Sequence, residues 1–198
     1  DLSALATRPA CDLNVGSTDI GQSTWFYDPA TGITSLISLT GNLVTRDNGS
    51  RYSQMSHMSD AGHVTGFNDL YNGGAERLGR VAWLFDPAAG QTYPLLFGVS
   101  TSGKAEVQIE ELTNEGAVVG WYAIYNGDTY AGVRAFYWRA GDGYIDLNQQ
   151  VVGGLAAAGL VNLTYAMHIT PDGRITGAAE PAGASPGGFQ LSYAIVRH

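Results

Sequence analysis

A repeat of about 55 residues constrains the fold of this chain more than any other feature. Three segments share a polar turn followed by Gly-x-aliphatic-x-Gly: DAGHVTGF from Asp60, NEGAVVGW from Asn114 and PDGRITGA from Pro171. Their first glycines are separated by 54 and 57 residues. Self-similarity at a fixed period indicates a repeated supersecondary unit. We therefore expect copies of one unit to build the whole fold.

An aromatic segment follows each of these turns. The copies are VAWLFDPAAGQTYPL from Val81, RAFYWRAGDGYIDL from Arg134 and LSYAIV from Leu191, and an earlier copy is STWFYDPATGITSL from Ser23. Asp28-Pro29-Ala30-Thr31-Gly32 and Asp86-Pro87-Ala88-Ala89-Gly90 are turn sequences, because proline and glycine set the backbone angles of a tight turn. The first three copies thus predict a strand, a turn and a second strand, and the last copy stops after its first strand. The first and last copies of the whole unit are less complete than the middle two.

The repeat predicts a four-stranded unit, with strand A before the glycine motif, strand B at the motif, and strands C and D in the aromatic hairpin. Four units, at about residues 1–50, 51–104, 105–162 and 163–198, fill a single all-β domain over residues 1–198. Four blades are the size of the smallest common propellers, so a four-bladed β-propeller is the leading prediction. An irregular β-sandwich or an open propeller, completed by dimerisation, is the alternative.

The charge of the chain limits its partners. The net charge is −8 and Lys104 is the only lysine, so no basic stripe is available for a phosphate backbone, and nucleic acid is excluded as a partner. No apolar run reaches the roughly 18 to 20 residues that span a bilayer, which predicts no membrane insertion. Cys11 is the only cysteine, so no intramolecular disulfide is expected.

The repeat resembles a known family. The residues Ala135-Phe136-Tyr137-Trp138, Gly143 and Asp146-Leu147, with strands of the Gly116-x-Val-Val-Gly120 type, resemble the HAF repeats of exported bacterial proteins. The likeness covers about residues 23 to 196 and departs from the family where its usual histidine is Arg134. The resemblance implies an extracellular or cell-surface β-repeat protein, whose signal peptide is absent from this sequence, and it implies almost nothing about chemistry.

One position in strand A suggests a metal site. His57, Glu111 and His168 each lie five residues before the first glycine of their motif. The A strands of a propeller are innermost, so these side chains are expected at one height around a central channel. Two imidazoles and a carboxylate form the first shell of many zinc and non-haem iron sites. The sequence thus predicts one divalent ion, zinc, iron or calcium.

A structural explanation of the same residues stays open. Strand side chains alternate between two faces, so His57 could lie between Met55 and Met58 and bond a neighbouring hydroxyl. Glu111 could pair with an arginine. The adjacent Ser59, Thr113 and Thr170 are predicted to bond backbone groups at the start of the turn between strands A and B.

The loops between strands B and C give a second candidate site. Tyr71 and Asn72 in one repeat are echoed by Tyr125 and Asn126 in the next. Tyrosine combines an apolar face with a hydroxyl, and loops on a rigid scaffold are common recognition sites, so this pair of loops predicts a sugar or other neutral polar ligand. Asn-Gly is also an ordinary turn sequence.

Two functions follow from these features. No nucleophile elbow, His-Glu-x-x-His, phosphate loop or dinucleotide fingerprint is present. The leading hypothesis is an exported bacterial recognition module that binds a carbohydrate or another extracellular ligand. The competing hypothesis is a metal-dependent hydrolase of an ester, lactone or glycan, in which His57, Glu111 and His168 hold the ion. A purely structural calcium or zinc site is a third possibility.

Overall fold

The strands of this chain form antiparallel sheets that follow the repeat. The structure is a computed structural model and describes residues 11–15, 18–183 and 196–197. The first repeat contains two hairpins, formed by β1 (Cys11–Val15) with β2 (Thr18–Ser23) and by β3 (Trp25–Asp28) with β4 (Ile33–Leu36). The second sheet contains β5 (Ser53–Met58), β6 (Val64–Leu70), β7 (Gly79–Asp86) and β8 (Gln91–Leu95).

The third and fourth sheets continue the same order. The third sheet contains β9 (Val107–Leu112), β10 (Val118–Asn126), β11 (Thr129–Arg139) and β12 (Gly143–Asp146). The fourth sheet contains β13 (Leu160–Ile169), β14 (Arg174–Pro181) and β15 (Val196–Arg197). Two short 3-10 turns, η2 (Asn42–Val44) and η3 (Leu147–Gln150), are the helical elements of the described residues. The all-β prediction is confirmed, as are four-stranded sheets in the second and third repeats.

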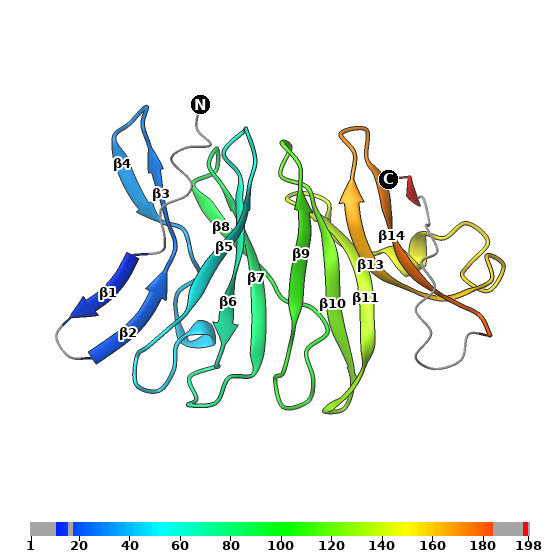
Figure 1. The fold of residues 1–198 in the computed structure, drawn as a ribbon, viewed down its shortest axis with the longest axis horizontal. Coiled ribbons are helices and arrows are strands. Elements are labelled where there is room, and N and C mark those ends of the chain that lie inside the picture. The colour runs from blue at the N-terminus through cyan, green and yellow to red at the C-terminus, as the bar shows by residue number, and fades with distance from the viewer. Residues whose placement is uncertain (1–10, 16–17, 184–195, 198) are drawn as a thin grey trace.

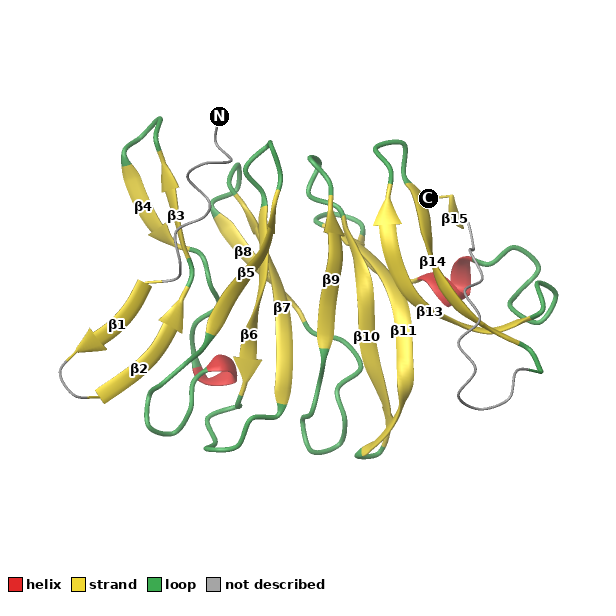
Figure 2. Cartoon of the chain, viewed as in Figure 1, coloured by secondary structure: helices red, strands yellow, loops and turns green. Residues whose placement is uncertain are grey.

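The sheets follow one another in a row (Figure 1). The hairpins of the first repeat lie at one end of the longest axis and the fourth sheet lies at the other, with their strands standing roughly side by side. Figure 2 shows the same row as strands joined by loops at both ends. The described residues do not form a closed ring of sheets, so closure into a propeller stays a prediction.

The second glycine of the repeated motif is required by a β-bulge. Strand A bulges next to this glycine in each of three A–B pairs, where Met55 opposes Gly66, Ile109 opposes Gly120 and Ala166 opposes Gly177. The last of these strands has two further irregularities nearer its start. A Cβ at each glycine would collide with a strand A carbonyl oxygen, that of Gln54, Gln108 or Tyr165. A bulge brings the two backbones together, so only glycine fits there.

The turn between strands A and B is capped by a side-chain hydroxyl, as predicted. The backbone N–H of His63 donates to Ser59 Oγ at 3.2 Å. In the same way, the N–H of Ala117 donates to the Thr113 hydroxyl at 3.2 Å and that of Arg174 to the Thr170 hydroxyl at 3.0 Å. The first glycine of each motif has a positive φ, between 74° and 86°. Hydroxyl and glycine therefore fix the same turn in three repeats.

The core is divided among the spaces between consecutive sheets. Strand C is buried on both faces, so neighbouring residues of β7 belong to different clusters: Trp83 and Phe85 pack with Ile37 of the first repeat, and Ala82 and Leu84 pack with Val107 of the third. A third cluster, which includes Val119, Leu163 and Ile175, joins the third and fourth sheets. Each repeat buries its apolar faces only against its neighbours.

Candidate functional site

Two of the three predicted metal ligands meet in the structure. His168 Nδ1 of β13 lies 2.8 Å from Glu111 Oε2 of β9, and the same carboxylate accepts the backbone N–H of Ile169. Glu111 therefore joins the third sheet to the fourth. The side chain of His168 is 62% exposed and that of Glu111 is 28% exposed.

His57 occupies the equivalent register but has a different partner. It opposes Thr65, just as Glu111 opposes Val119 and His168 opposes Thr176. His57 Nδ1 lies 3.3 Å from the Thr65 hydroxyl, which agrees with the structural explanation of this histidine. Among the described residues, no group of three or more His, Cys, Asp or Glu side chains is arranged to hold a metal ion. The metal site stays a prediction.

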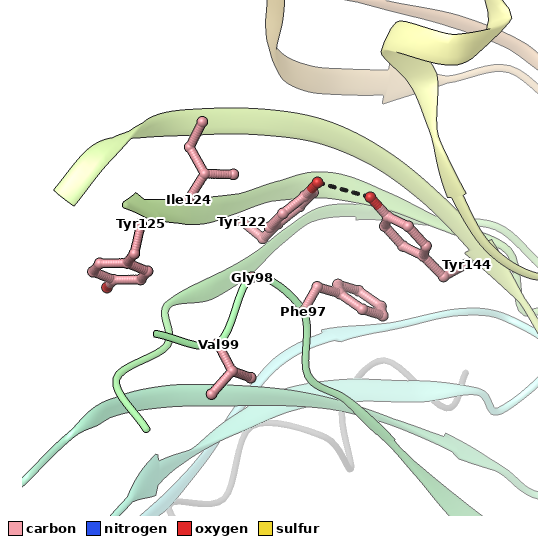
Figure 3. A pocket seen from close by; sticks show the side chains of 7 residues that line it. All are labelled: Phe97, Gly98, Val99, Tyr122, Ile124, Tyr125 and Tyr144. Carbon is pink, nitrogen blue, oxygen red and sulfur yellow. Dashed lines mark hydrogen bonds between the residues drawn. The ribbon is translucent and has the colours of Figure 1, made fainter. Parts of the chain in front are cut away.

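An aromatic pocket of about 350 Å³ opens beside the third sheet. Its lining residues come from the loop between β8 and β9, from β10 and from β12: Phe97, Gly98, Val99, Tyr122, Ile124, Tyr125 and Tyr144. Figure 3 shows the rings of Phe97, Tyr122 and Tyr144 gathered on one side of this space and Tyr125 on the other. We call this space the tyrosine pocket.

The rings of the tyrosine pocket hold one another in place. Phe97 lies with its ring centroid 4.5 Å from that of Tyr144 and 5.9 Å from that of Tyr122. The Tyr144 hydroxyl donates a hydrogen bond of 2.8 Å to the Tyr122 hydroxyl. Gly98, with φ of 60°, bends the loop so tightly that a Cβ there would collide with Ala123 O. The aromatic wall is therefore built before any ligand arrives.

The tyrosine pocket carries no formal charge. None of its lining side chains is acidic or basic. Burial raises the pKa of Tyr144, and the hydrogen bond to Tyr122 raises it further. Burial also raises the pKa of Tyr125, with a second contribution from the negative charge of Glu106. The phenols of Tyr125 and Tyr144 thus stay protonated near neutral pH and present neutral donors and acceptors.

Of the four predicted ligand-binding residues, only Tyr125 lines this pocket. Tyr71 is 5% exposed, donates its hydroxyl proton to Asp69 Oδ2 at 3.1 Å, and lies under the guanidinium of Arg46. Asn72, with φ of 51°, serves as a turn residue. Asn126 is exposed at the end of β10, where it pairs with Thr129.

A network of charges links the Tyr71 loop to the third sheet. Arg77 Nε donates to Asp69 Oδ1 at 2.7 Å, and its Nη2 lies 3.9 Å from Glu106 Oε2. Arg80 Nε lies 3.6 Å from the other oxygen of Glu106. Burial raises the pKa of Glu106, and the two arginines oppose that rise. These ion pairs join the loop of Tyr71 to the start of the third sheet, and no charged side chain of the network lines the tyrosine pocket.

Sequence reasoning missed Phe97, Tyr122 and Tyr144. They lie in three separate elements and belong to no shared motif, so no local spacing connects them. The only available signal was the number of tyrosines, which is 11.

In the described part of the chain, no helix has the length and apolar character needed to cross a membrane. Comparison with protein-family models, with curated proteins and with solved structures found no match to this chain.

Proposed function

We propose that this protein is a recognition module that binds a neutral carbohydrate in the tyrosine pocket. The observation that carries the proposal is the Tyr144–Tyr122 hydroxyl pair, set at 2.8 Å within a wall of aromatic rings that bears no charge. Sugars present an apolar face of C–H groups beside hydroxyls. A pocket of aromatic faces with a few placed polar groups matches both features.

The hydroxyl pair has hydrogen-bonding capacity left for a ligand. A phenol has one proton to donate and two lone pairs to accept. Tyr122 accepts the Tyr144 proton and so keeps its own proton to donate, while Tyr144 keeps its lone pairs. The pair therefore offers one donor and one acceptor side by side. A sugar hydroxyl needs both, whereas a purely apolar ligand would leave them unpaired at a cost of about 1 to 3 kcal/mol.

The pocket excludes some ligand classes on charge. The chain carries a net charge of −8, and no cation lines the pocket, so an acidic glycan would meet repulsion without a compensating partner. Neutral sugars are the class that this site favours.

We also propose that the four repeats are blades of a small exported β-propeller. The sequential order of strands in the second and third sheets, and the packing of consecutive sheets on one another, support this architecture. Export to the extracellular space or cell surface rests on the resemblance to HAF repeats.

Affinity electrophoresis in native gels tests the binding proposal. The acidic protein migrates readily, and gels that contain a neutral polysaccharide, such as galactomannan, xyloglucan, laminarin or dextran, should retard it. Tyr144→Phe keeps the ring and removes the bonded hydroxyl. We therefore expect the affinity for the polysaccharide to fall about tenfold, which the gel shows as weaker retardation. Tyr130→Phe is the matched control, because Tyr130 is 61% exposed and does not line the pocket.

The outcome distinguishes binding in the tyrosine pocket from nonspecific adsorption to the polysaccharide. Retardation by at least one neutral polysaccharide, lost in Tyr144→Phe and kept in Tyr130→Phe, supports the proposal. Equal retardation of both variants, retardation only by acidic pectate or alginate, or no retardation across the panel overturns it.

A further inference from the structure

The hydroxyl pair of the tyrosine pocket crosses one face of β11. Tyr122 belongs to β10 and Tyr144 to β12, and β11 lies between these two strands in the sheet. Figure 3 shows the hydrogen bond that joins their hydroxyls. Tyr122 opposes Arg134 and Tyr144 opposes Trp138 in the register. Directly opposed residues share a face, so the side chain of Arg134 lies on the face that the hydroxyl pair crosses.

Asp146 holds the Arg134 side chain beside this pair. Arg134 Nη1 donates to Asp146 Oδ2 at 3.2 Å, and Asp146 Oδ1 accepts the backbone N–H of Asn148 at 3.0 Å. Asp146 is 6% exposed and lies two residues after Tyr144 on β12, so the two side chains share a face. Arg134 therefore extends from the level of Tyr122 across β11 toward the strand that carries Tyr144.

The charge of Arg134 acts on the phenol of Tyr144. Burial is the largest influence on the pKa of Tyr144 and raises it, whereas the positive charge of Arg134 opposes that rise. This effect agrees with a guanidinium close to the hydroxyl pair. The negative charge of Asp146 acts in the other direction. The ion pair thus brings hydrogen-bond donors to the pocket without a net charge.

Arg134 keeps donors that a ligand could use. A guanidinium carries several N–H donors in a planar fork. Among the described residues, its bond to Asp146 is the one hydrogen bond that the Arg134 side chain makes, and 43% of that side chain is exposed. The exposed donors therefore lie next to the donor and acceptor of the tyrosine pair.

We propose that Arg134 determines the specificity of the tyrosine pocket, by donating to the sugar hydroxyl adjacent to the one that Tyr122 and Tyr144 bind. This inference rests on the proposed function, since it needs a neutral sugar in the pocket. The tyrosine pair offers one donor and one acceptor, which a single hydroxyl uses. The guanidinium offers donors only, which suits a second hydroxyl on the neighbouring ring carbon. The ligand is a neutral glycan whose rings carry two adjacent free hydroxyls.

Neutral polysaccharides with different linkages test this ligand class. Dextran is linked through the hydroxymethyl group, so its rings keep all their adjacent hydroxyls, and the galactomannan backbone keeps an adjacent pair. Laminarin is linked through the middle ring hydroxyl, so rings within its chain keep no adjacent pair. In affinity electrophoresis, we expect the dissociation constant of the wild-type chain to be at least about tenfold lower for dextran or galactomannan than for laminarin.

A lysine substitution isolates the planar fork of the arginine. Arg134→Lys keeps a positive charge beside Asp146 but replaces the fork by a compact ammonium. The affinity for the polysaccharide with adjacent hydroxyls should fall about tenfold, and the preference over laminarin should disappear. Arg139→Lys is the matched control, because Arg139 is an exposed residue of the same strand, on the opposite face, and does not line the pocket. Thermal melts check that both variants are folded.

Retardation by laminarin that equals or exceeds that by dextran and galactomannan overturns the proposal, and so does unchanged affinity in Arg134→Lys. The wild-type comparison needs no variant, so it is decisive even where Arg134→Lys does not fold. Tyr144→Phe separates the two proposals. If Tyr144→Phe weakens retardation and Arg134→Lys does not, the pocket binds sugar without Arg134 and only this inference fails. If no polysaccharide retards the chain, both proposals fail.

Discussion

The β3–β4 hairpin of the first repeat and the β7–β8 hairpin of the second share the pattern Trp-x-x-Asp-Pro-Ala-x-Gly-x-Thr but have different surroundings. Asp28 Oδ1 accepts the N–H of Ala30 at 2.9 Å, and Asp86 Oδ1 accepts that of Ala88 at 2.8 Å. Both turns end in a glycine with positive φ. Yet Trp83 is fully buried, whereas the equivalent Trp25 is partly exposed. Local sequence sets the hairpin, and the neighbouring strand sets the burial.

The largest expected effect comes from the two tryptophans. Trp83→Ala should lower the free energy of unfolding by about 3 to 5 kcal/mol, because it leaves a large cavity between sheets. Trp25→Ala should cost about 1 kcal/mol, since water already reaches that ring. Urea unfolding of both variants measures the difference.

Trp83→Phe sharpens this test. The third repeat has Phe136 at the equivalent position, and Trp83 Nε1 is a buried donor without an acceptor among the described residues. Trp83→Phe should therefore recover most of the stability lost in Trp83→Ala. Equal losses for Trp83→Ala and Trp25→Ala would show that the two hairpins are buried alike.

The next largest loss of stability is expected from replacing a glycine at a bulge, compared with a glycine in an open turn. A Cβ at Gly66 would collide with Gln54 O and the Trp83 ring, so Gly66→Ala should cost about 2 to 3 kcal/mol. Gly90→Ala, at φ 62° with open space around it, should cost only the left-handed strain of about 1 kcal/mol. Thermal unfolding ranks the two; a larger loss for Gly90→Ala would contradict the role given to the bulge.

The sequence predicted what is local and repeated. The hairpins, the capped turns at Ser59, Thr113 and Thr170 and the four-stranded sheets all follow from signals within a few residues of one another. The equal register of His57, Glu111 and His168 was predictable from the same alignment. Which of these side chains contact one another was not predictable, because those contacts depend on how separate sheets pack.

The tyrosine pocket shows the same limit. Its residues come from a loop and two strands that are far apart in the sequence, and each one alone looks like an ordinary aromatic position of a β-sheet. Only the packing of Phe97 against Tyr122 and Tyr144 makes them a site.

A smaller loss of stability is expected at the contact between the third and fourth sheets. Glu111 bonds both His168 and the backbone of Ile169, so Glu111→Ala should lower the free energy of unfolding by about 1 to 2 kcal/mol. His168→Ala should cost less than about 0.5 kcal/mol, because that side chain is 62% exposed. Urea unfolding at low salt checks both; a larger loss for His168→Ala would contradict this division.

The central claim is that the repeats fold alike locally and that, among the described residues, β3 has no strand at the edge where β7 pairs with β6. Amide hydrogen exchange tests it residue by residue. We expect the N–H groups of Trp83 and Phe85 to exchange slowly and those of Trp25 and Tyr27 to exchange quickly, while Phe26 is protected by β4. Slow exchange at Trp25 and Tyr27, matching Trp83 and Phe85, would show that the edge is already filled and would contradict the account.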